Sequence, residues 1–418
     1  MGSGLPDWLA RLEARHPKSI DLGLDRVGQV WSRLGRPIDF PVITVGGTNG
    51  KGSACAYLDA MLGEAGYRVG QYTSPHLLRF NERIQLDGQP AGDAEIVAAL
   101  EAVEAARDGD SLTYFEHTTL AAMWLFQRAG IDAAVLEVGL GGRLDAVNLF
   151  DADCAVVTSV DLDHIDYLGP DRESIGFEKA GIFRSGRPAV CTDPAPPQSL
   201  LNHAGTIGAD LLRLGDGIRV EAGEGGWLCR VGERIYPALP RPAMAGAHQY
   251  GNAAAAIAAL DALRDRLPAS MSAIRAGLAT ARVPGRFQIV GQSPLRIVDV
   301  AHNPHAARAL AASLAELPPG GRRWAVFAML VDKDADGVIA PLAGLIDHWY
   351  LAGLSGARGR SAPDLAELFA RRGLPHTPCD NVAAAWHLAC RAAGPADTIA
   401  AFGSFHTVAE VMALTQHG

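Results

Sequence analysis

The chain is poor in cysteine, and the spacing of the cysteines is as informative as their number. Six occur in 418 residues, and no two of them form a C-x-x-C pair. Neither a disulfide framework nor a zinc site is therefore indicated, and we expect a reducing, cytoplasmic location. The six are Cys55, Cys154, Cys191, Cys229, Cys379 and Cys390.

Long apolar runs and an excess of basic residues are also missing. No stretch approaches the roughly 20 apolar residues of a membrane-spanning helix. The N-terminal residues, with Asp7, Arg11 and Glu13, lack the apolar region of a signal peptide. A net charge of −9 argues against a nucleic-acid-binding surface. We therefore expect neither a membrane nor a nucleic acid as a partner.

Apolar β-branched runs alternate with helical stretches rich in alanine and leucine. This alternation predicts an α/β protein with a mostly parallel sheet, and the length predicts two or three domains at about 100–200 residues each. Segment 211–236 has short runs between glycine-rich turns, which indicates an antiparallel patch; a helix is expected to start near Gly246. The predicted strands include residues 42–45, 133–136, 155–158, 295–300, 324–328 and 397–402.

The segment GGTNGKGS at 46–53 follows one of these strands and opens a predicted helix. In such a turn, backbone N–H groups and the helix N-terminus bind phosphate, a lysine reaches the outer phosphates, and a hydroxyl serves Mg²⁺ or phosphate. The strict Walker pattern is not met, because its first glycine would fall at Val45. A simple glycine-rich turn with a solvated lysine is the less favoured alternative. The residues predicted to bind nucleotide here are Gly47, Thr48, Asn49, Gly50, Lys51, Gly52 and Ser53.

Polar side chains follow three predicted strands. Glu137 ends an apolar strand before a glycine-rich loop, and His164 lies in a polar cluster after the next strand. Ser74 follows a short strand and could offer a hydroxyl. Ligands bind beyond the carboxyl ends of strands in open α/β sheets, and Mg²⁺ prefers oxygen ligands. From the residues alone, a surface or helix-capping histidine is slightly favoured for His164, and an ordinary turn is the alternative for Ser74.

Eight segments in the same order resemble one family, and the resemblance runs from about residue 20 to the C-terminus. The family is that of the folylpolyglutamate synthases, in particular the bacterial bifunctional dihydrofolate synthase/folylpolyglutamate synthases, within the wider group of Mur ligases. The segments are GGTNGKGS at 46–53, YTSPHL at 72–77, LEVGLGGRLDAVN at 136–148, DHIDYLG at 163–169, EKAGIFR at 178–184, PGRFQ at 284–288, DVAHNPHA at 299–306 and GSFHTVAEVM at 403–412.

The resemblance implies a P-loop ATPase domain and a smaller Rossmann-like C-terminal domain, with the active site between them. We place the boundary at the 283–286 hinge, which gives domains of residues 1–285 and 286–418. The implied partners are ATP, Mg²⁺, L-glutamate, dihydropteroate and reduced folates, joined through an acyl phosphate. A monofunctional folylpolyglutamate synthase is the alternative, and a monomer is expected.

The resemblance also implies roles for single residues, and it overrides the surface interpretation of His164. The implied metal ligands are Ser53, Ser74, Glu137 and His164. The implied catalytic residues are Lys51, Glu137, His164 and Lys179, the last as a carbamate. The implied ATP contacts outside the loop are Asn252, Arg286, Asp299 and His302.

Several alternatives stay open. Without the resemblance, Lys179 would be an exposed lysine paired with Glu178 or Glu173. Phe115 could stack on a pterin or pack in the core, and Ser404 could bind glutamate or cap a helix.

A Mur ligase for a UDP-sugar peptide is disfavoured because we expect no room before residue 46 for a further domain. A P-loop kinase is disfavoured because no Walker B run is evident. A non-catalytic nucleotide-binding module is disfavoured because the catalytic residues given above are all present.

Overall fold

The computed structural model describes residues 4–16, 20–35, 37–223, 225–318 and 320–416. Within these ranges the chain forms two compact units. Unit 1 consists of the described residues up to Ala243 together with Gln249–Arg282, and unit 2 consists of Met244–His248 together with the described residues from Val283 onward. The chain therefore passes between units at 243/244, 248/249 and 282/283. The domain boundary after residue 285, with the functions assigned to its two sides, stays a prediction.

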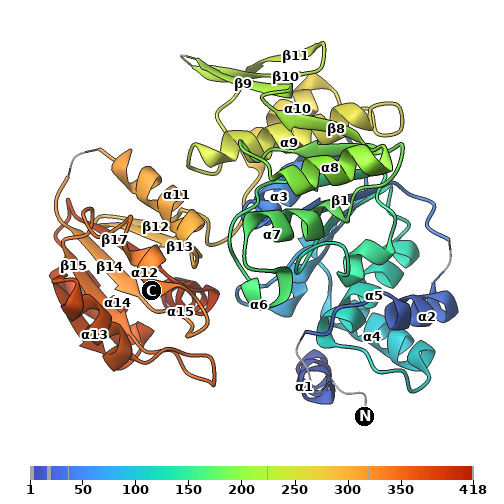
Figure 1. The fold of residues 1–418 in the computed structure, drawn as a ribbon. Helices are drawn as coiled ribbons and strands as arrows, with labels where there is room; N and C mark the ends of the chain where they lie inside the picture. Colours follow the sequence, from blue (N-terminus) through green and yellow to red (C-terminus); the bar gives the residue numbers. More distant parts are fainter. Residues whose placement is uncertain (1–3, 17–19, 36, 224, 319, 417–418) are drawn as a thin grey trace. The chain divides into compact units, whose positions relative to one another are not determined.

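Unit 1 is built on an 11-stranded sheet with the order β11-β10-β9-β8-β7-β6-β1-β5-β2-β3-β4 (Figure 1). All strand pairs from β9 through β8, β7, β6, β1 and β5 to β2 are parallel. The central strand β1 buries all five of its residues, as expected for an apolar strand covered on both faces. The strands are β1 Val42–Gly46, β2 Val69–Tyr72, β3 Ile84–Leu86, β4 Gln89–Pro90, β5 Ala133–Glu137, β6 Cys154–Val157, β7 Pro188–Cys191, β8 Asp210–Leu214, β9 Gly217–Gly223, β10 Gly226–Val231 and β11 Arg234–Leu239.

Several helices of unit 1 begin directly after a capping side chain or a glycine. Tyr114–Ala129 starts after Thr113, whose side chain accepts from the amide of Glu116 in a capping box. Lys51–Glu64 starts after Gly50, which is left-handed and offers no capping side chain. The helices are α1 Leu5–Arg15, α2 Asp25–Leu34, α3 Lys51–Glu64, α4 Asp93–Arg107, α5 Tyr114–Ala129, α6 Ile165–Leu168, α7 Arg172–Ala180, α8 Gln198–Ile207, α9 His248–Ala262 and α10 Met271–Thr280, with 3₁₀ turns η1 Phe80–Arg83 and η2 Ala146–Leu149.

The antiparallel patch predicted for segment 211–236 is present as a three-stranded ribbon. Strands β9, β10 and β11 pair antiparallel at one end of the large sheet (Figure 1). The first run of the segment, β8, instead continues the parallel part by pairing with β7. The helix expected near Gly246 is α9, which starts at His248.

Unit 2 contains a six-stranded sheet with the order β12-β13-β17-β14-β15-β16, in which only the β12–β13 pair is antiparallel. Four aromatic rings pack together in its largely aliphatic core: Trp349 lies 5.0 Å from Phe369 between ring centroids, and Phe327 lies 5.4 Å from Phe402. The strands are β12 Gln288–Gln292, β13 Leu295–Asp299, β14 Arg323–Phe327, β15 His348–Ala352, β16 His376–Cys379 and β17 Thr398–Phe402. The helices are α11 Pro304–Ala315, α12 Ala335–Ile339, α13 Ala362–Arg371, α14 Val382–Ala392 and α15 Phe405–Gln416.

The predicted fold class is confirmed, since both units are α/β and the larger has the mostly parallel sheet. Among the described residues, no helix is long and apolar enough to span a membrane. The six cysteines are free thiols in the structure.

Candidate active site

Two glycines shape the loop between β1 and α3. Gly47 has a φ of 144° and Gly50 a φ of 87°, a region that side chains rarely adopt. A Cβ on Gly47 would collide with the hydroxyl of Thr158, and a Cβ on Gly50 would collide with the side-chain oxygen of Asn252. The glycines thus allow the loop backbone to lie directly against β6 and α9.

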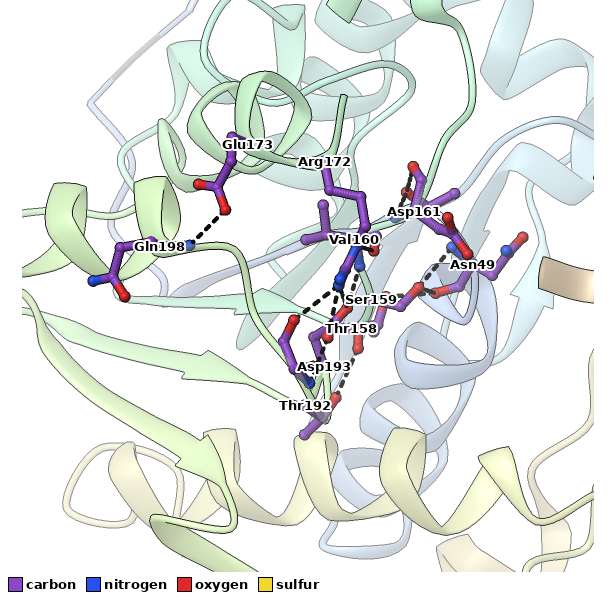
Figure 2. Close-up of polar contacts among 12 residues, drawn as sticks. Asn49, Thr158, Ser159, Val160, Asp161, Arg172, Glu173, Thr192, Asp193 and Gln198 are labelled. Carbon is purple, nitrogen blue, oxygen red and sulfur yellow. Dashed lines mark hydrogen bonds and ion pairs between the residues drawn. The ribbon is translucent and has the colours of Figure 1, made fainter. Parts of the chain in front are cut away.

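The segment after β6 holds this loop by hydrogen bonds (Figure 2). The hydroxyl of Thr158 donates to the carbonyl of Asn49 at 2.6 Å, and the amide of Asn49 donates to Ser159 Oγ at 3.0 Å. The amide of Thr48 donates to the Ser159 carbonyl at 2.7 Å, and its hydroxyl interacts with the backbone of Asp161 at 3.0 Å. The amides of Thr48 and Asn49 therefore fix the loop itself, and their predicted contact with nucleotide stays a prediction.

The N-terminus of α3 is the part of the loop suited to an anion. The first amides of a helix have no partner within the helix, and together with the helix dipole they attract negative charge. The Nζ of Lys51, the first helical residue, lies 3.3 Å from the Thr48 carbonyl and so is folded over the loop. Buried Ser53 accepts from Gln249 Nε2 at 3.4 Å, and Asn252 donates to Gln249 at 3.1 Å. This geometry fits phosphate binding.

The carboxylate of Glu137 lies next to the loop at the end of β5. It is buried, and its Oε2 accepts from the amide of Ser74 at 3.0 Å. A Cβ on Gly52 would lie 3.8 and 3.9 Å from its two oxygens. The ends of β1, β2 and β5 thus bring Glu137, Ser74 and the phosphate loop together.

His164 differs from Glu137 in being partly exposed. Its side chain is 38% accessible, its backbone is left-handed with a φ of 51°, and Nε2 lies 3.9 Å from Asp163 Oδ1. Within the described ranges, no three histidine, cysteine, aspartate or glutamate side chains are grouped for a metal ion. The predicted metal ligands are two serines, Glu137 and His164, so only two of them are of these residue types. The absence of such a group therefore does not test this set of ligands, which stays a prediction.

Lys179 is buried on the last turn of α7, at 4% exposure. Burial, and next the charge of Lys51, lower its pKa to about 7, although Asp163 and Asp145 act in the opposite direction. The alternative of an exposed, ion-paired lysine is therefore wrong.

The two glutamates considered as partners of that lysine are engaged elsewhere. Glu178 pairs with Arg143 at 2.8 Å, and the oxygens of Glu173 accept from backbone amides at the start of α8. Lys179 is thus a buried amine that feels the charge of Lys51 and whose lowered pKa leaves a large neutral fraction near pH 7.

The predicted residues of unit 2 lie at the turn before β12, at the end of β13 and in the segment after β13. The two carboxylate oxygens of Asp299 accept from the amides of Phe287 and Ala301, each at 2.8 Å. Burial raises the pKa of Asp299, and the positive charge of Arg286 opposes that shift. His302 Nδ1 lies 2.9 Å from the Val300 carbonyl. Their contact with ATP stays a prediction.

For Ser404 and Phe115, the local contacts support the structural alternative, helix capping and core packing. Ser404 Oγ accepts from the amide of Thr407 at 3.0 Å, so it caps α15 as one alternative proposed. Phe115 is half-buried, with its ring centroid 5.8 Å from that of Tyr72. A Cβ on Gly139 would meet the Phe115 ring at 2.6 Å, so the ring packs in the core on that side. Roles in binding glutamate and pterin stay predictions.

Comparison with known proteins places this geometry in a family. The Mur ligase middle domain matches residues 45–194, and the Mur ligase glutamate ligase domain matches residues 285–405. A dihydrofolate synthase/folylpolyglutamate synthase of Escherichia coli K12 is 48% identical over 98% of this chain and 95% of its own length. The chain belongs to the dihydrofolate synthase/folylpolyglutamate synthase family.

Solved structures of this family agree over almost the whole chain. Escherichia coli FolC in complex with DHPP and ADP is 48% identical, covers 99% of this chain and 98% of its own, and has a TM-score of 0.95. The Yersinia pestis bifunctional enzyme with AMPPNP and Mn ion is 47% identical with the same coverage and a TM-score of 0.92. A further bifunctional enzyme structure, with Mn, AMPPNP and L-glutamate, has the same identity, coverage and TM-score.

Gly50→Ala is expected to weaken nucleotide binding at least about tenfold, because a Cβ at a φ of 87° against Asn252 displaces the loop. Gly63→Ala, in the helix that begins after Gly50, is the matched control. Gly63 has no atom within 4 Å of an added Cβ, and its replacement should stabilise α3 by up to about 1 kcal/mol without changing affinity. Calorimetric titration with ADP and urea unfolding of both variants separate the two effects. An ADP affinity of Gly50→Ala equal to that of the unaltered protein would contradict the assigned loop geometry.

Proposed function

We propose that this chain is an ATP-dependent ligase that adds L-glutamate both to dihydropteroate, forming dihydrofolate, and to the γ-carboxylate of reduced folates. The observation that carries the proposal is 48% identity over 98% of the chain to a dihydrofolate synthase/folylpolyglutamate synthase. The phosphate loop, its lysine and Glu137 at one edge of the sheet support it. A monofunctional folylpolyglutamate synthase is the alternative.

The chemistry requires an activated carboxylate. A carboxylate does not react with an amine at neutral pH because its leaving group is poor, so its oxygen first attacks the γ-phosphorus of ATP and ADP departs. The neutral glutamate amine then attacks the acyl phosphate carbonyl, and the amide forms as phosphate leaves and the amine nitrogen loses one proton. Lys51 and the first amides of α3 would stabilise the charge on the transferring phosphoryl group.

The residues present fit a magnesium ion at this edge. Ser53, Ser74, Glu137 and His164 would hold it, and the first three offer the oxygen atoms that Mg²⁺ prefers. The support is that Glu137 is buried, bonded to the Ser74 amide and adjacent to Gly52. When bound, the ion would neutralise phosphate charge during transfer. A relative with AMPPNP and Mn ion is consistent with a divalent metal here.

We propose that Lys179 carries a carbamate. A neutral amine attacks CO₂, whereas an ammonium does not, and the pKa of about 7 leaves much of Lys179 neutral. The carbamate would convert a cation that Lys51 repels into an anion that Lys51 attracts.

Further elements of the proposal rest on the family. Asn252, Arg286, Asp299 and His302 are proposed to contact ATP, and Asn252 already lies against the phosphate loop. We propose a monomer in the cytoplasm, and the free cysteines support the reducing compartment. Residues 1–285 would bind ATP and residues 286–418 would form the glutamate ligase domain.

The direct test is incubation with ATP, Mg²⁺, glutamate and either dihydropteroate or tetrahydrofolate. Mass spectrometry of the products should show one added glutamate on each acceptor, with one phosphate released per bond. Omitting glutamate is the control, and no amide should then form. Addition to tetrahydrofolate alone would favour the monofunctional alternative, and addition to neither acceptor would refute the ligase proposal.

A further inference from the structure

Asp193, just after β7, is a buried carboxylate whose two oxygens are both engaged (Figure 2). Oδ2 accepts from the amide of Val160 at 2.6 Å, and Oδ1 accepts from the amide of Ala195 at 2.8 Å. Arg172 Nη2 donates to Oδ1 at 3.2 Å and lies 3.4 Å from Oδ2. These charge-assisted bonds fix the carboxylate in one orientation.

The guanidinium of Arg172 bonds the backbone carbonyls of the same two residues, Val160 and Ala195. Its Nε donates to the carbonyl of Val160 at 2.9 Å, and Nη2 donates to the carbonyl of Ala195 at 2.9 Å. The N–H and the C=O of Val160 are therefore both bonded to the Arg172–Asp193 pair. This pair replaces the sheet hydrogen bonds that end with β6 at Val157.

Val160 lies between the residues that hold the phosphate loop. Ser159 bonds Thr48 and Asn49 on one side of it, and Asp161 bonds Thr48 on the other. Fixing the peptide groups of Val160 therefore fixes the segment against which the loop rests.

The same pair anchors the first residue of the helix that carries Lys179. Arg172 is the first residue of α7, and Lys179 lies on its last turn. The next residue, Glu173, accepts from the amides of Gln198 and Ser199 at 3.1 and 2.7 Å, which attaches α7 to α8. The start of the helix that carries Lys179 and the segment that holds the phosphate loop are thus both bonded to the Arg172–Asp193 pair.

We propose that Arg172 and Asp193 are positioning residues for Mg²⁺-nucleotide: they hold segment 158–161, and through it the phosphate loop, in the binding geometry without touching the nucleotide. This inference rests on the proposed nucleotide site. Residues that orient direct ligands through hydrogen bonds commonly change affinity or activity about 10–100-fold when replaced.

Asp193→Asn tests the proposal with little change in volume. An asparagine has one acceptor oxygen, so its NH₂ group must face one of the donors that Asp193 now accepts from. The dissociation constant of Mg²⁺-ADP, measured by calorimetric titration at a temperature where the variant is fully folded, is expected to rise at least about tenfold.

Asp153→Asn is the matched control because Asp153 has the same kinds of partner, a backbone amide and arginine, but lies before β6, at the opposite end of the parallel strands from Asp193. Its Oδ2 accepts from the amide of Val42 at 2.9 Å, and its Oδ1 pairs with Arg266 at 2.7 Å and Arg187 at 3.3 Å. This variant should lose thermal stability as Asp193→Asn does, with the affinity for Mg²⁺-ADP unchanged.

The outcomes separate the proposal from the function on which it rests. Unchanged affinity in Asp193→Asn, or equal weakening in Asp153→Asn, would overturn the positioning role. Should Asp193→Asn fail to fold, Arg172→Lys replaces it, because the 41%-exposed Arg172 side chain tolerates change and a lysine cannot make all of its bonds. Unchanged affinity there would also overturn the proposal. Absence of Mg²⁺-ADP binding by the unaltered protein would refute the nucleotide site instead.

Discussion

Lys51→Ala is expected to lower ATP turnover at least about a hundredfold at saturating substrates, because it removes a positive charge where phosphoryl charge develops. The fold should survive, since the hydrogen bond from Lys51 Nζ to the Thr48 carbonyl is long, at 3.3 Å. Phosphate release in the presence of glutamate and tetrahydrofolate measures the loss.

Arg68→Ala is the control for loss of a surface cation. Arg68 precedes β2, so it lies at the edge of the sheet opposite the phosphate loop, and its side chain is 55% exposed. Its replacement should leave turnover within about twofold, as for exposed residues away from a site. Turnover of Lys51→Ala close to that of the unaltered enzyme would remove the basis for the phosphate-loop assignment.

Lys179→Ala is expected to lose at least about a hundredfold in turnover, since the carbamate would supply charge among reacting groups. The truncation leaves space at a buried position, so acetate or another small carboxylic acid should restore part of the activity. Lys179→Met, which fills much of that space, should respond less to acetate if the space is what admits it. Loss without any rescue would point to a structural role for the lysine.

The carbamate itself has a predictable pH dependence. Above the Lys179 pKa of about 7, the neutral amine reacts with CO₂ and one proton is released. Below it the ammonium must first lose a proton, so two are released. At a fixed concentration of dissolved CO₂, occupancy should therefore rise from pH 6 to 8.

Carbon-13 NMR with labelled CO₂ measures this occupancy. The carbamate signal should be lost in Lys179→Ala and kept in Lys333→Ala, which removes a lysine of unit 2 between β14 and α12. A signal absent at pH 8 in the unaltered protein would exclude the modification.

Sequence reasoning located the parts of the site that follow directly from strand ends. Gly47, Gly50 and Lys51 could be placed because a glycine-rich turn between a buried strand and a helix has one geometry suited to phosphate. Glu137 could be placed because parallel strands end at one edge of the sheet. In each case the signal lies within about ten residues of the chain.

The rest depends on contacts between distant segments. Thr158 and Ser159 bond Asn49 across separations of 109 and 110 residues, and Asp193 bonds Val160 across 33. No local pattern marks these pairs, although Thr158-Ser159 at a strand end was a visible polar cluster. The burial of Lys179 was likewise hidden, because the helix around it carries charged residues at neighbouring positions.

The repeated passage of the chain between the two units has a consequence for dissecting the protein. Residues Met244–His248 belong with unit 2, where Gly246 is closely packed by His248 and Ser313, yet they precede most of α9 and all of α10 in the sequence. A fragment ending at Arg282 would retain this five-residue segment without its packing partners, and a fragment beginning at Val283 would lack it. Neither half is a complete module, so exchange of whole domains between relatives requires two separated stretches of sequence to be transferred together.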